Sequence, residues 1–329
     1  MVTQQAKRLA VLTSGGDAPG MNAAIRAVVR SAIPRGYDVL GFRHGFTGLI
    51  DGDCFRLDAR SVGGIIDRGG TILGTSRCER LKTPSGQRAA SQQIRAHVLD
   101  ALVVIGGNGS HAGAYKLSQH GVPVIGLAST IDNDLPGCET TIGATTALDT
   151  AIQAIDRLRV TAAAHGRVFL VEVMGRDSGH LALAAGIAGG AESIVVPEID
   201  VDAETVAAQI LSAYQRGKSH AIVVVAEGAR YNADSLANHF HAHRDRLGFE
   251  LRVTKLGHIQ RGGAPGVYDR LIASQLGAAA VDHLAAGESG LSLGILNGKV
   301  TATLLSDLLQ ANKKPLNAEL INLAQILAK

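Results

Sequence analysis

The feature that most constrains the fold is a series of short apolar runs that recur along the chain and end in glycine or polar residues. Several of these runs are continuously hydrophobic and do not alternate, which is typical of strands buried on both faces of a parallel sheet. We predict strands at Leu9–Leu12, Tyr37–Phe42, Ala101–Ile105, Val122–Leu127, Val168–Val173, Ser193–Val196 and Ala221–Val225.

Segments with a helical pattern lie between these runs. We predict helices at Ala18–Ser31 (with Pro19 in the first turn), Ser61–Arg68, Gln87–Leu99, Ala144–Arg159, Ala203–Gln215, Ala233–Asp245 and Tyr268–Ala286. Strands and helices that alternate over 329 residues predict an α/β fold with doubly wound, mostly parallel sheets. The length permits two such domains, although no low-complexity linker separates them.

The composition excludes several functional classes. Glycine accounts for 40 of the 329 residues, about 12% against a usual ~7%, which indicates tight turns or backbone that lies close to a ligand. The net charge of +3 and the 3% of aromatic residues argue against a nucleic-acid partner. The longest uncharged stretch of small residues, Leu181–Ala191, is too short to span a membrane, and Met1–Arg8 predicts no signal peptide. The scattered Cys54, Cys78 and Cys138 predict reduced thiols in a cytoplasmic protein.

Two glycine-rich segments follow predicted strands. The first, Thr13–Asn22, precedes the first predicted helix, and the second, Gly106–Ser110, precedes a helix with Gly113 in its first turn. Glycine lets backbone N–H groups approach an anion, and a helix N-terminus adds a positive dipole. Two such loops at one sheet edge predict a site for an extended phosphate ligand, although each alone is compatible with a structural turn. Neither has the Walker A or GxGxxG pattern, which disfavours P-loop NTPases and nicotinamide dehydrogenases.

Charged residues follow other predicted strands. Arg77 ends a third glycine-containing loop and is either a phosphate clamp or a surface residue. Asp132 and Asp134 could take a proton from a hydroxyl group and organise a metal or water, or they could cap an Asx-type turn. A set suited to a second phosphate on an acceptor comprises Arg167, Arg176, Arg252, His258 and Arg261. Together these residues predict phosphoryl transfer to a phosphorylated small molecule.

Five motifs, in this order, resemble the ATP-type bacterial 6-phosphofructokinase family: Thr13–Asn22, Gly69–Thr71, Thr130–Asp134, Val173–Arg176 and Gly257–Gly263. The resemblance covers nearly the whole chain. It implies transfer of the γ-phosphoryl group of ATP to the 1-hydroxyl of fructose 6-phosphate in glycolysis, with Mg²⁺ as cofactor. It also implies an allosteric, cytoplasmic homotetramer with shared active sites, each in the cleft between two similar α/β domains. The expected limits are residues 1–143 with 260–313 for the ATP domain, and 144–259 with 314–329 for the fructose 6-phosphate domain.

The resemblance implies a role for each residue at a motif position. Asp132 matches the catalytic base with Thr130 beside it, and Arg77 and Arg176 match arginines at the transferred phosphoryl group. Nucleotide positions are Gly16, Arg77, Cys78, Gly107, Asn108, Gly109, Ser110 and Gly113; metal positions are Asn108 and Asp134. Substrate positions are Thr130, Asp132, Met174, Gly175, Arg176, Glu227, His258 and Arg261, with Arg167 and Arg252 supplied by a neighbouring subunit. Effector positions for ADP or phosphoenolpyruvate are Arg26, Arg30, Arg159, Glu192, Arg216 and Lys218.

The chain departs from the family pattern at a few positions. Asn108 stands where the family usually has an Asp that helps to hold Mg²⁺, which predicts weaker metal use or a lower rate unless water and Asp134 compensate. Gly109 stands where pyrophosphate-using relatives carry Asp, which favours ATP, while Ser129 matches neither donor type. Ala59 replaces an effector arginine, so the response to the usual effectors is open. The alternatives are a pyrophosphate-dependent enzyme and a catalytically weak regulatory paralogue.

Overall fold

The computed structural model describes residues 7–328, which form two compact units. Unit 1 contains the chain up to Ile131, Leu135–Thr146 and Arg261–Lys313, and unit 2 contains Asp132–Asp134, Ala147–Gln260 and the chain from Lys314 onward. The chain changes unit at residues 146/147, 260/261 and 313/314, and the short segment Asp132–Asp134 leaves unit 1 and returns to it. The assignment of one ligand to each domain stays a prediction.

Unit 1 is built around a seven-stranded sheet with the strand order β11-β10-β5-β4-β1-β2-β3. The central strands are parallel, and the edge strands β3 and β11 are antiparallel to their neighbours. Every residue of β4 and β5 is buried, which confirms the sheet type predicted from continuous apolar runs. The strands are β1 (Lys7–Ser14), β2 (Tyr37–Phe42), β3 (Cys54–Leu57), β4 (Ala101–Gly106), β5 (Val124–Ala128), β10 (Leu291–Leu296) and β11 (Lys299–Leu304).

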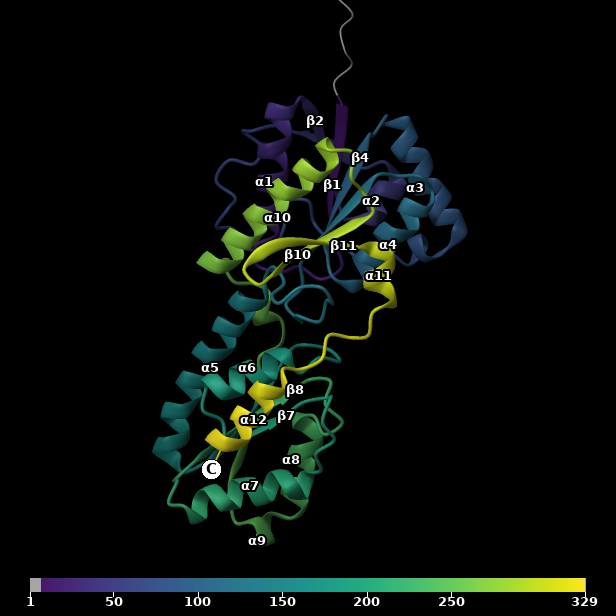
Figure 1. Ribbon diagram of the computed structural model, residues 1–329. Coiled ribbons are helices and arrows are strands. Elements are labelled where there is room, and N and C mark those ends of the chain that lie inside the picture. Colours follow the sequence, from purple (N-terminus) through teal and green to yellow (C-terminus); the bar gives the residue numbers. More distant parts are fainter. Residues whose placement is uncertain (1–6, 329) are drawn as a thin grey trace, which may run out of the picture. The chain divides into compact units, whose positions relative to one another are not determined.

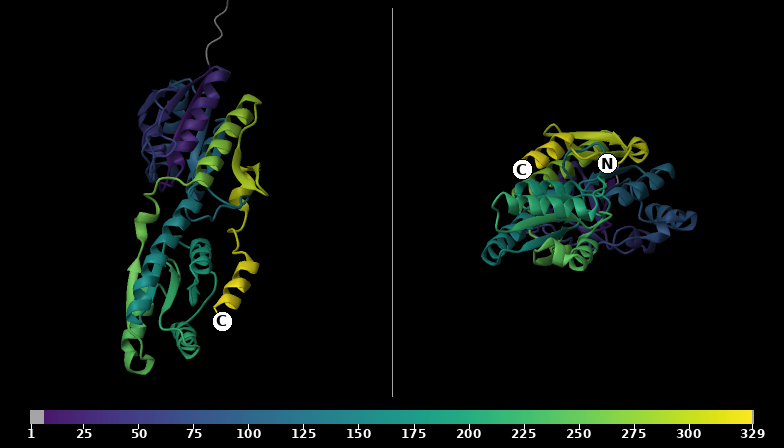
Figure 2. Two further views of the ribbon diagram at one scale, coloured as in Figure 1. Left: turned by 90° about the vertical axis from the view of Figure 1, so that its left-hand side faces the viewer. Right: turned by 90° about the horizontal axis from the view of Figure 1, so that it is seen from below.

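Helices cover both faces of the unit 1 sheet (Figure 1). On one face α1 (Met21–Ala32) and α10 (Val267–Ala285) lie side by side (Figure 2). Their approach is close because Gly277 has no side chain: a Cβ atom there would lie 2.7 Å from the Cβ of Ala27. The other face carries α2 (Phe46–Asp51), α3 (Pro84–Ala96), α4 (Asn108–Gln119), α11 (Leu305–Gln310) and the 3-10 helix η2 (Glu79–Lys82), while the 3-10 helix η1 (Ile33–Arg35) follows α1.

Unit 2 has a four-stranded parallel sheet with the order β7-β8-β6-β9. Buried side chains of α7 and α8 pack on β6 and β8 in one hydrophobic core, and α12 contacts α6. The strands are β6 (Val168–Val173), β7 (Ser193–Val195), β8 (Ala221–Ala226) and β9 (Leu251–Lys255). The helices are α5 (Ala144–His165), which begins in unit 1, α6 (His180–Ala188), α7 (Ala203–Gln215), α8 (Ala233–Ala242), α9 (Arg244–Leu247), α12 (Ala318–Leu327) and the 3-10 helix η3 (Gly257–Gln260).

The helix predicted at residues 61–68 is wrong. These residues form turns, because Gly63 and Gly64 are adjacent and each makes a helix less stable by about 1 kcal/mol. Gly64 also has a φ of +65°, which lies outside the helical region. The turns connect β3 to the loop that contains Arg77.

Two other helices have a different start from the predicted one, α1 a later start and α4 an earlier one. α1 begins at Met21, because Gly20 before it has a φ of 113°, and Pro19 therefore lies in the preceding loop. α4 begins at Asn108, so Gly113 lies in its second turn and not in its first. The later start of α1 lengthens the irregular backbone after β1, whereas Gly107 alone separates β4 from α4.

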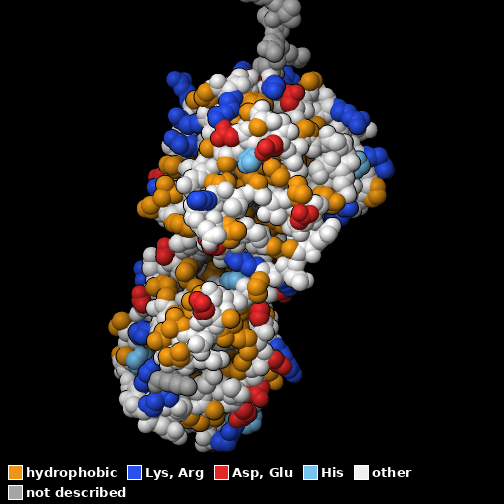
Figure 3. Space-filling view, viewed as in Figure 1, with side chains coloured by type: hydrophobic (Ala, Val, Ile, Leu, Met, Phe, Trp, Pro, Cys, Tyr) orange, Lys and Arg blue, Asp and Glu red, His pale blue; other side chains and the backbone are white. Residues whose placement is uncertain are grey.

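The surface of the described residues carries charges of both signs. Lys and Arg side chains are interspersed with Asp and Glu side chains over the face shown in Figure 3. Among residues 7–328, no helix is both long and apolar enough to cross a membrane.

Candidate active site

The predicted site residues fall into two groups, one in each unit. In unit 1 the first glycine-rich loop leaves β1 and is fastened to the loop at residues 69–77. The side chain of Thr13 contacts that of Thr71 (Oγ1 to Oγ1, 2.9 Å) and donates to the carbonyl of Gly74 at 2.8 Å. Gly15 has a φ of 90°, and its N–H donates to the carbonyl of Ser76 at 3.2 Å. The third loop is therefore held against the first, one residue before Arg77.

Asn22 is a structural residue of this region that the sequence reasoning missed. Its side-chain nitrogen donates to the carbonyls of Arg68 and Gly69, and its oxygen accepts from the N–H of Ile72 at 2.8 Å. The side chain is 1% exposed, so these bonds are shielded from water. The signal in the sequence was a polar Asn at the end of the glycine-rich motif, within the first predicted helix.

The second glycine-rich loop connects β4 to α4. Gly107 is the N-cap residue, and Asn108 and Gly109 are exposed in the first helical turn. First-turn amides have no acceptor within their own helix, so this end of α4 presents N–H groups and the positive end of a helix dipole. Ser110 is buried and donates to the carbonyl of Ser14 at 2.9 Å. That bond joins the second loop to the first, so the N–H groups predicted to bind an anion lie along one edge of the sheet.

Two glycines of this segment serve different purposes. A Cβ atom on Gly109 would meet nothing within 4 Å, so the fold itself leaves space at this position. A Cβ atom on Gly113 would lie 2.7 Å from both Leu81 and Phe46, so this glycine permits close packing of α4. Gly113 was predicted at a nucleotide position, and the structure places it in the core.

Arg261 lies with the phosphate loops of unit 1. Its Nη1 donates to the carbonyl of Asp17 at 2.9 Å, and a Cβ atom on Gly16 would lie 2.7 Å from the same nitrogen. Arg261 is 8% exposed, whereas Arg77 is exposed and Cys78 is half-buried. A guanidinium group against the first loop raises the positive potential along this edge.

In unit 2, Asp132 is the most buried of the predicted catalytic residues, at 3% exposure. Oδ2 of Asp132 lies 3.7 Å from Nε of Arg176, and its main-chain carbonyl accepts from Oγ of Ser178 at 3.2 Å. Asn133 has a φ of 52°, a left-handed conformation that Asn tolerates better than most residues. The preceding Thr130 is buried, and its carbonyl accepts from Oγ1 of Thr141 at 2.5 Å. These contacts fix the backbone around the carboxylate.

Arg176 is held in an unusual backbone conformation after β6. Its φ is 51°, and that of the preceding Gly175 is 144°. Glu227 stabilises this turn, because its Oε1 accepts from the N–H of Arg176 at 2.9 Å and of Gly175 at 3.3 Å. A Cβ atom on Gly228 would lie 1.8 Å from the carbonyl oxygen of Arg176, so only glycine permits this approach. The Glu227–Gly228 pair thus positions the arginine.

Met174 and Gln260 form a second buried contact beside this turn. The N–H of Met174 donates to Oε1 of Gln260 at 2.9 Å, and the two residues are 8% and 0% exposed. Gln260 was singled out only as part of a motif. His258 lies two residues earlier in the same 3-10 helix and is exposed.

The structure does not bring Arg167 and Arg252 to Asp132 within one chain. Arg167 precedes β6, which is 6 residues long, whereas Arg176 follows it. The two arginines therefore lie at opposite ends of this strand, about 20 Å apart. Both arginines contact Glu250, with Nε of Arg167 at 2.8 Å and Nη2 of Arg252 at 3.6 Å from Oε2. The guanidinium of Arg167 lowers the pKa of Glu250.

The predicted effector residues of unit 2 surround the end of α7. Nζ of Lys218 lies 2.7 Å from Oε1 of Glu192, which is 6% exposed, and the guanidinium of Arg159 lies beside Gly190. Arg216 donates to Oγ of Ser212 at 2.6 Å and to the carbonyl of Ala328.

Two further effector positions, Arg26 and Arg30, lie on α1 in unit 1. Nη2 of Arg30 donates to the carbonyl of Ala59 at 3.3 Å, which places it beside the residue that departs from the family pattern. Arg26 is half-buried and Arg30 is exposed. The neighbouring Arg60 is exposed as well.

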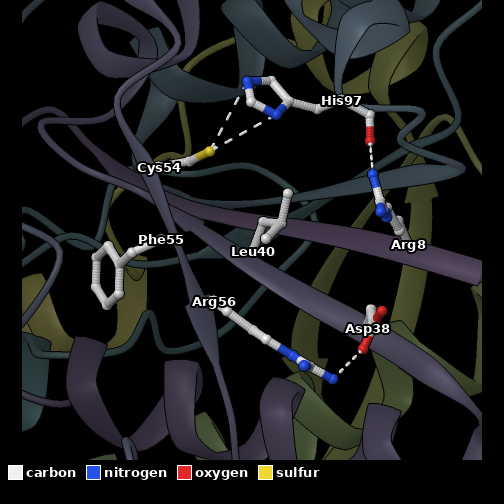
Figure 4. A pocket seen from close by; sticks show the side chains of 7 residues that line it. All are labelled: Arg8, Asp38, Leu40, Cys54, Phe55, Arg56 and His97. Atoms are coloured by element: carbon white, nitrogen blue, oxygen red, sulfur yellow. Dashed lines mark hydrogen bonds and ion pairs between the residues drawn. The ribbon is translucent and has the colours of Figure 1, made fainter.

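A cavity of about 370 Å³ lies elsewhere in unit 1, along β1, β2 and β3 (Figure 4). It contains no predicted site residue, since Arg8 and Asp38 come from the start of their strands and the phosphate loops follow the strand ends. Sγ of Cys54 lies 3.8 Å from Nε2 of His97. Burial, and then the carboxylate of Asp53, raise the pKa of Cys54, so this thiol is a poor nucleophile at neutral pH. The cavity is lined by Arg8, Asp38, Leu40, Cys54, Phe55, Arg56 and His97.

One α/β unit has glycine-rich loops suited to an anion, and the other has a carboxylate–arginine pair. This combination is typical of a phosphoryl-transfer protein. A model of the phosphofructokinase family matches residues 8–284. The chain therefore belongs to the phosphofructokinase family.

Curated relatives agree with this assignment. The chain is 50% identical over 322 residues to the ATP-dependent 6-phosphofructokinase of Halalkalibacterium halodurans, which covers 98% of this chain and 99% of that protein. It is 50% identical over 323 residues to ATP-dependent 6-phosphofructokinase 1 of Thermus thermophilus, with 98% and 99% covered. These relatives support a kinase that uses ATP.

Solved structures share the fold. Phosphofructokinase from Saccharomyces cerevisiae matches with a TM-score of 0.84 and 35% identity over 92% of this chain, which spans 45% of that chain. A pyrophosphate-dependent phosphofructokinase from Marinobacter aquaeolei matches with a TM-score of 0.86 and 24% identity, covering 98% of this chain and 91% of that chain. Because a pyrophosphate-dependent protein shares this fold, the fold alone does not identify the phosphoryl donor.

Proposed function

We propose that this chain is an ATP-dependent 6-phosphofructokinase of glycolysis. It transfers the γ-phosphoryl group of ATP to the 1-hydroxyl of fructose 6-phosphate and yields ADP and fructose 1,6-bisphosphate. The observation that carries this proposal is the buried Asp132 beside Arg176, in a chain about 50% identical to proteins of that name over nearly its full length. A carboxylate within reach of a guanidinium group provides a base and a positive charge for the same reacting centre.

The transfer step assigns a task to each residue. Asp132 takes the proton of the sugar 1-hydroxyl, and the oxygen of that hydroxyl forms a bond to the γ-phosphorus. At the same time the bond from that phosphorus to the ADP oxygen breaks. Arg176 and Arg77 offset the negative charge on the transferred oxygens. The 6-phosphate is bound by His258 and Arg261, and the sugar by Met174, Gly175 and Glu227. Thr130 lies beside the base at 8% exposure.

The residues of the predicted metal position fit a hard cation such as Mg²⁺. Asp134 offers a carboxylate and Asn108 a neutral amide oxygen, and Asn108 is exposed at the first position of α4. Oxygen ligands and retained waters are what Mg²⁺ prefers. When bound, Mg²⁺ neutralises charge on the donor phosphates. Asn108 contributes no formal charge, so Asp134 carries the larger share of the attraction.

We propose a homotetramer with shared active sites. Arg167 and Arg252 lie near the amino-terminal ends of β6 and β9, whereas Arg176 follows the other end of β6. They therefore serve a neighbouring subunit, and the active site of a single chain is incomplete. The effector positions around Lys218 and Glu192 bind ADP or phosphoenolpyruvate. The free thiols of the three cysteines agree with a cytoplasmic location.

One assay tests the proposal and its alternatives. Fructose 6-phosphate is supplied with Mg-ATP or with Mg-pyrophosphate, and fructose 1,6-bisphosphate is measured through coupled enzymes. We expect turnover with ATP and at least ~10²-fold less with pyrophosphate. Turnover with pyrophosphate alone would replace the donor assignment. No turnover with either donor, in a correctly folded protein that binds fructose 6-phosphate, would leave the regulatory paralogue.

A further inference from the structure

A group of side chains far from the predicted catalytic residues in sequence has the composition of a metal site. Glu204 lies in the first turn of α7, His239 in the last turn of α8, and His243 is the C-cap residue of α8. One possible ligand atom from each of the three lies within 4.8 Å of the other two. The helices α7, α8 and α9 lie side by side in unit 2 (Figure 1).

The two histidines have the spacing that a metal requires on a helix. They are four residues apart, so they lie on the same face one turn apart. Their rings are stacked, with centroids 4.4 Å apart and planes 28° apart. Nδ1 of His243 lies 2.8 Å from the carbonyl oxygen of His239, so a proton on Nδ1 leaves the Nε2 lone pair of His243 available to a cation.

Glu204 completes the group from the facing helix. Its Oε1 lies 2.8 Å from Nε2 of His239. Ligand atoms around a tetrahedral Zn²⁺ are ~3.3 Å apart, because each bond to the ion is ~2.0–2.1 Å long. Side-chain rotations that move the ligand atoms by about 1 Å would therefore form the coordination shell. The side chains of Glu204 and His239 are 50% and 27% exposed, which leaves room for a water ligand.

Arg246 competes with a cation for this carboxylate. Its Nη2 lies 2.5 Å from the same Oε1 of Glu204, and Arg246 belongs to the short helix α9 that follows α8. The guanidinium group thus occupies the place that a metal would take. Removal of this positive charge would therefore strengthen metal binding, because Glu204 would then be available to the cation.

We propose that Glu204, His239 and His243 bind one divalent cation of the Zn²⁺, Co²⁺ or Ni²⁺ class. Two imidazoles and one carboxylate are borderline ligands that suit these ions, whereas Mg²⁺ prefers oxygen alone. The site joins the first turn of α7 to the end of α8, and it is separate from the position proposed for catalytic Mg²⁺. Because only folded unit 2 brings the ligands together, the bound ion stabilises the protein.

The experiment uses the full chain after treatment with a chelator. Isothermal titration with ZnCl₂ gives stoichiometry and affinity, and thermal unfolding with and without Zn²⁺ gives stabilisation. We expect the variant carrying both His239→Gln and His243→Gln to lose one equivalent of bound Zn²⁺ and the Zn²⁺-dependent rise in Tm. Arg246→Gln should bind Zn²⁺ at least ~3-fold more tightly, by removal of a neighbouring positive charge.

His241→Gln is the matched control, since His241 lies on the same helix and is exposed but is not part of the group. It should bind as the unmodified chain does. Co²⁺ provides a second readout, because the visible absorption of the bound ion should disappear in the double variant. Unchanged stoichiometry in the double variant, an equal loss in the control, or weaker binding in Arg246→Gln would each overturn the proposal.

Discussion

Nε of Arg176 lies 3.7 Å from Oδ2 of Asp132, although the two residues are 44 positions apart in the chain. The pair is unequal in burial: the side chain of Asp132 is 4% exposed and that of Arg176 is 50% exposed. The carboxylate is therefore fixed by the fold, whereas the guanidinium has a side open to solvent. A base needs a fixed position, and a group that follows the phosphoryl group in transfer needs freedom to move.

Asp132→Asn should lower kcat by at least ~10²-fold, because the amide keeps the shape of the side chain but cannot accept the sugar proton. Steady-state rates with saturating ATP and fructose 6-phosphate measure the effect. Circular dichroism and Tm serve as controls for folding. A rate within ~3-fold of the unmodified enzyme would contradict the assignment of Asp132 as the base.

Gly228→Ala should disturb Arg176 without touching a substrate. A Cβ atom there would lie 1.8 Å from the carbonyl oxygen of Arg176, so the turn held by Glu227 must shift. We expect kcat to fall at least ~10-fold, with KM for ATP changed less than ~3-fold, since displacements of about 1 Å cost rates of this size or more. An unaltered kcat would show that the turn does not position Arg176.

Gly109→Asp and Gly109→Ala separate space from charge. Neither should lower Tm, because a Cβ atom at Gly109 meets nothing within 4 Å. The Asp variant should raise KM for ATP by ~10-fold or more through repulsion of the donor phosphates, while the Ala variant should change it much less. Gly113→Ala is the contrasting case, since its Cβ would lie 2.7 Å from Leu81 and Phe46 and should lower Tm. Equal effects of the two Gly109 variants would contradict the charge argument.

Asn108→Asp should lower the Mg²⁺ concentration that gives half-maximal rate, because a second carboxylate adds attraction for the ion. Titration of MgCl₂ at fixed ATP measures this concentration. Asn108→Ala should raise it, and Asn108→Gln serves as a neutral control of similar polarity. No difference between the Asp variant and the unmodified enzyme would mean that water ligands and Asp134 already suffice.

The buried His111 and the half-buried His180 predict how stability depends on pH. Burial lowers the pKa of His111 and His180 below the ordinary value of 6.5, and Lys314 lowers that of His180 further. The unfolded chain then binds more protons than the folded chain below about pH 6.5. The free energy of unfolding should therefore fall as the pH decreases through this window, by up to ~1.4 kcal/mol per pH unit for each histidine.

Urea unfolding at several pH values between about 5 and 8 measures this slope. His111→Asn keeps a donor toward the carbonyl of Gly107 but cannot be protonated, so it should reduce the slope. His220→Gln, at a half-buried histidine of unit 2, is the control. A slope that is unchanged in His111→Asn would refute the assignment.

The fold was predictable where burial governs the sequence. The continuous apolar runs of β4, β6 and β8 predicted parallel strands, because both faces of these strands are covered. The strand β11 was missed because it lies at a sheet edge, and its burial pattern alternates between exposed and half-buried. The helix α12 was missed because it has no buried residue to produce a strong pattern.

The site residues were predictable as types but not as contacts. The motif around Asp132 pointed to a base, yet nothing in the sequence showed that Glu227 would bond the N–H of Arg176. Gln260 contacts Met174 from 86 positions away in the chain, a separation at which local patterns carry no signal. Such bonds depend on tertiary packing, which places distant backbone groups within hydrogen-bond distance.

The sharing of Glu250 by Arg167 and Arg252 at the amino edge of β6 and β9 has a consequence for mixed populations of chains. In the proposed tetramer a defect in Arg252 would damage the site of a neighbour, while a defect in Asp132 would damage the chain's own site. Two inactive variants, co-assembled, would then regenerate some intact sites by complementation. A defective subunit would likewise inactivate sites that it shares with intact subunits, so such a mutation would be partly dominant.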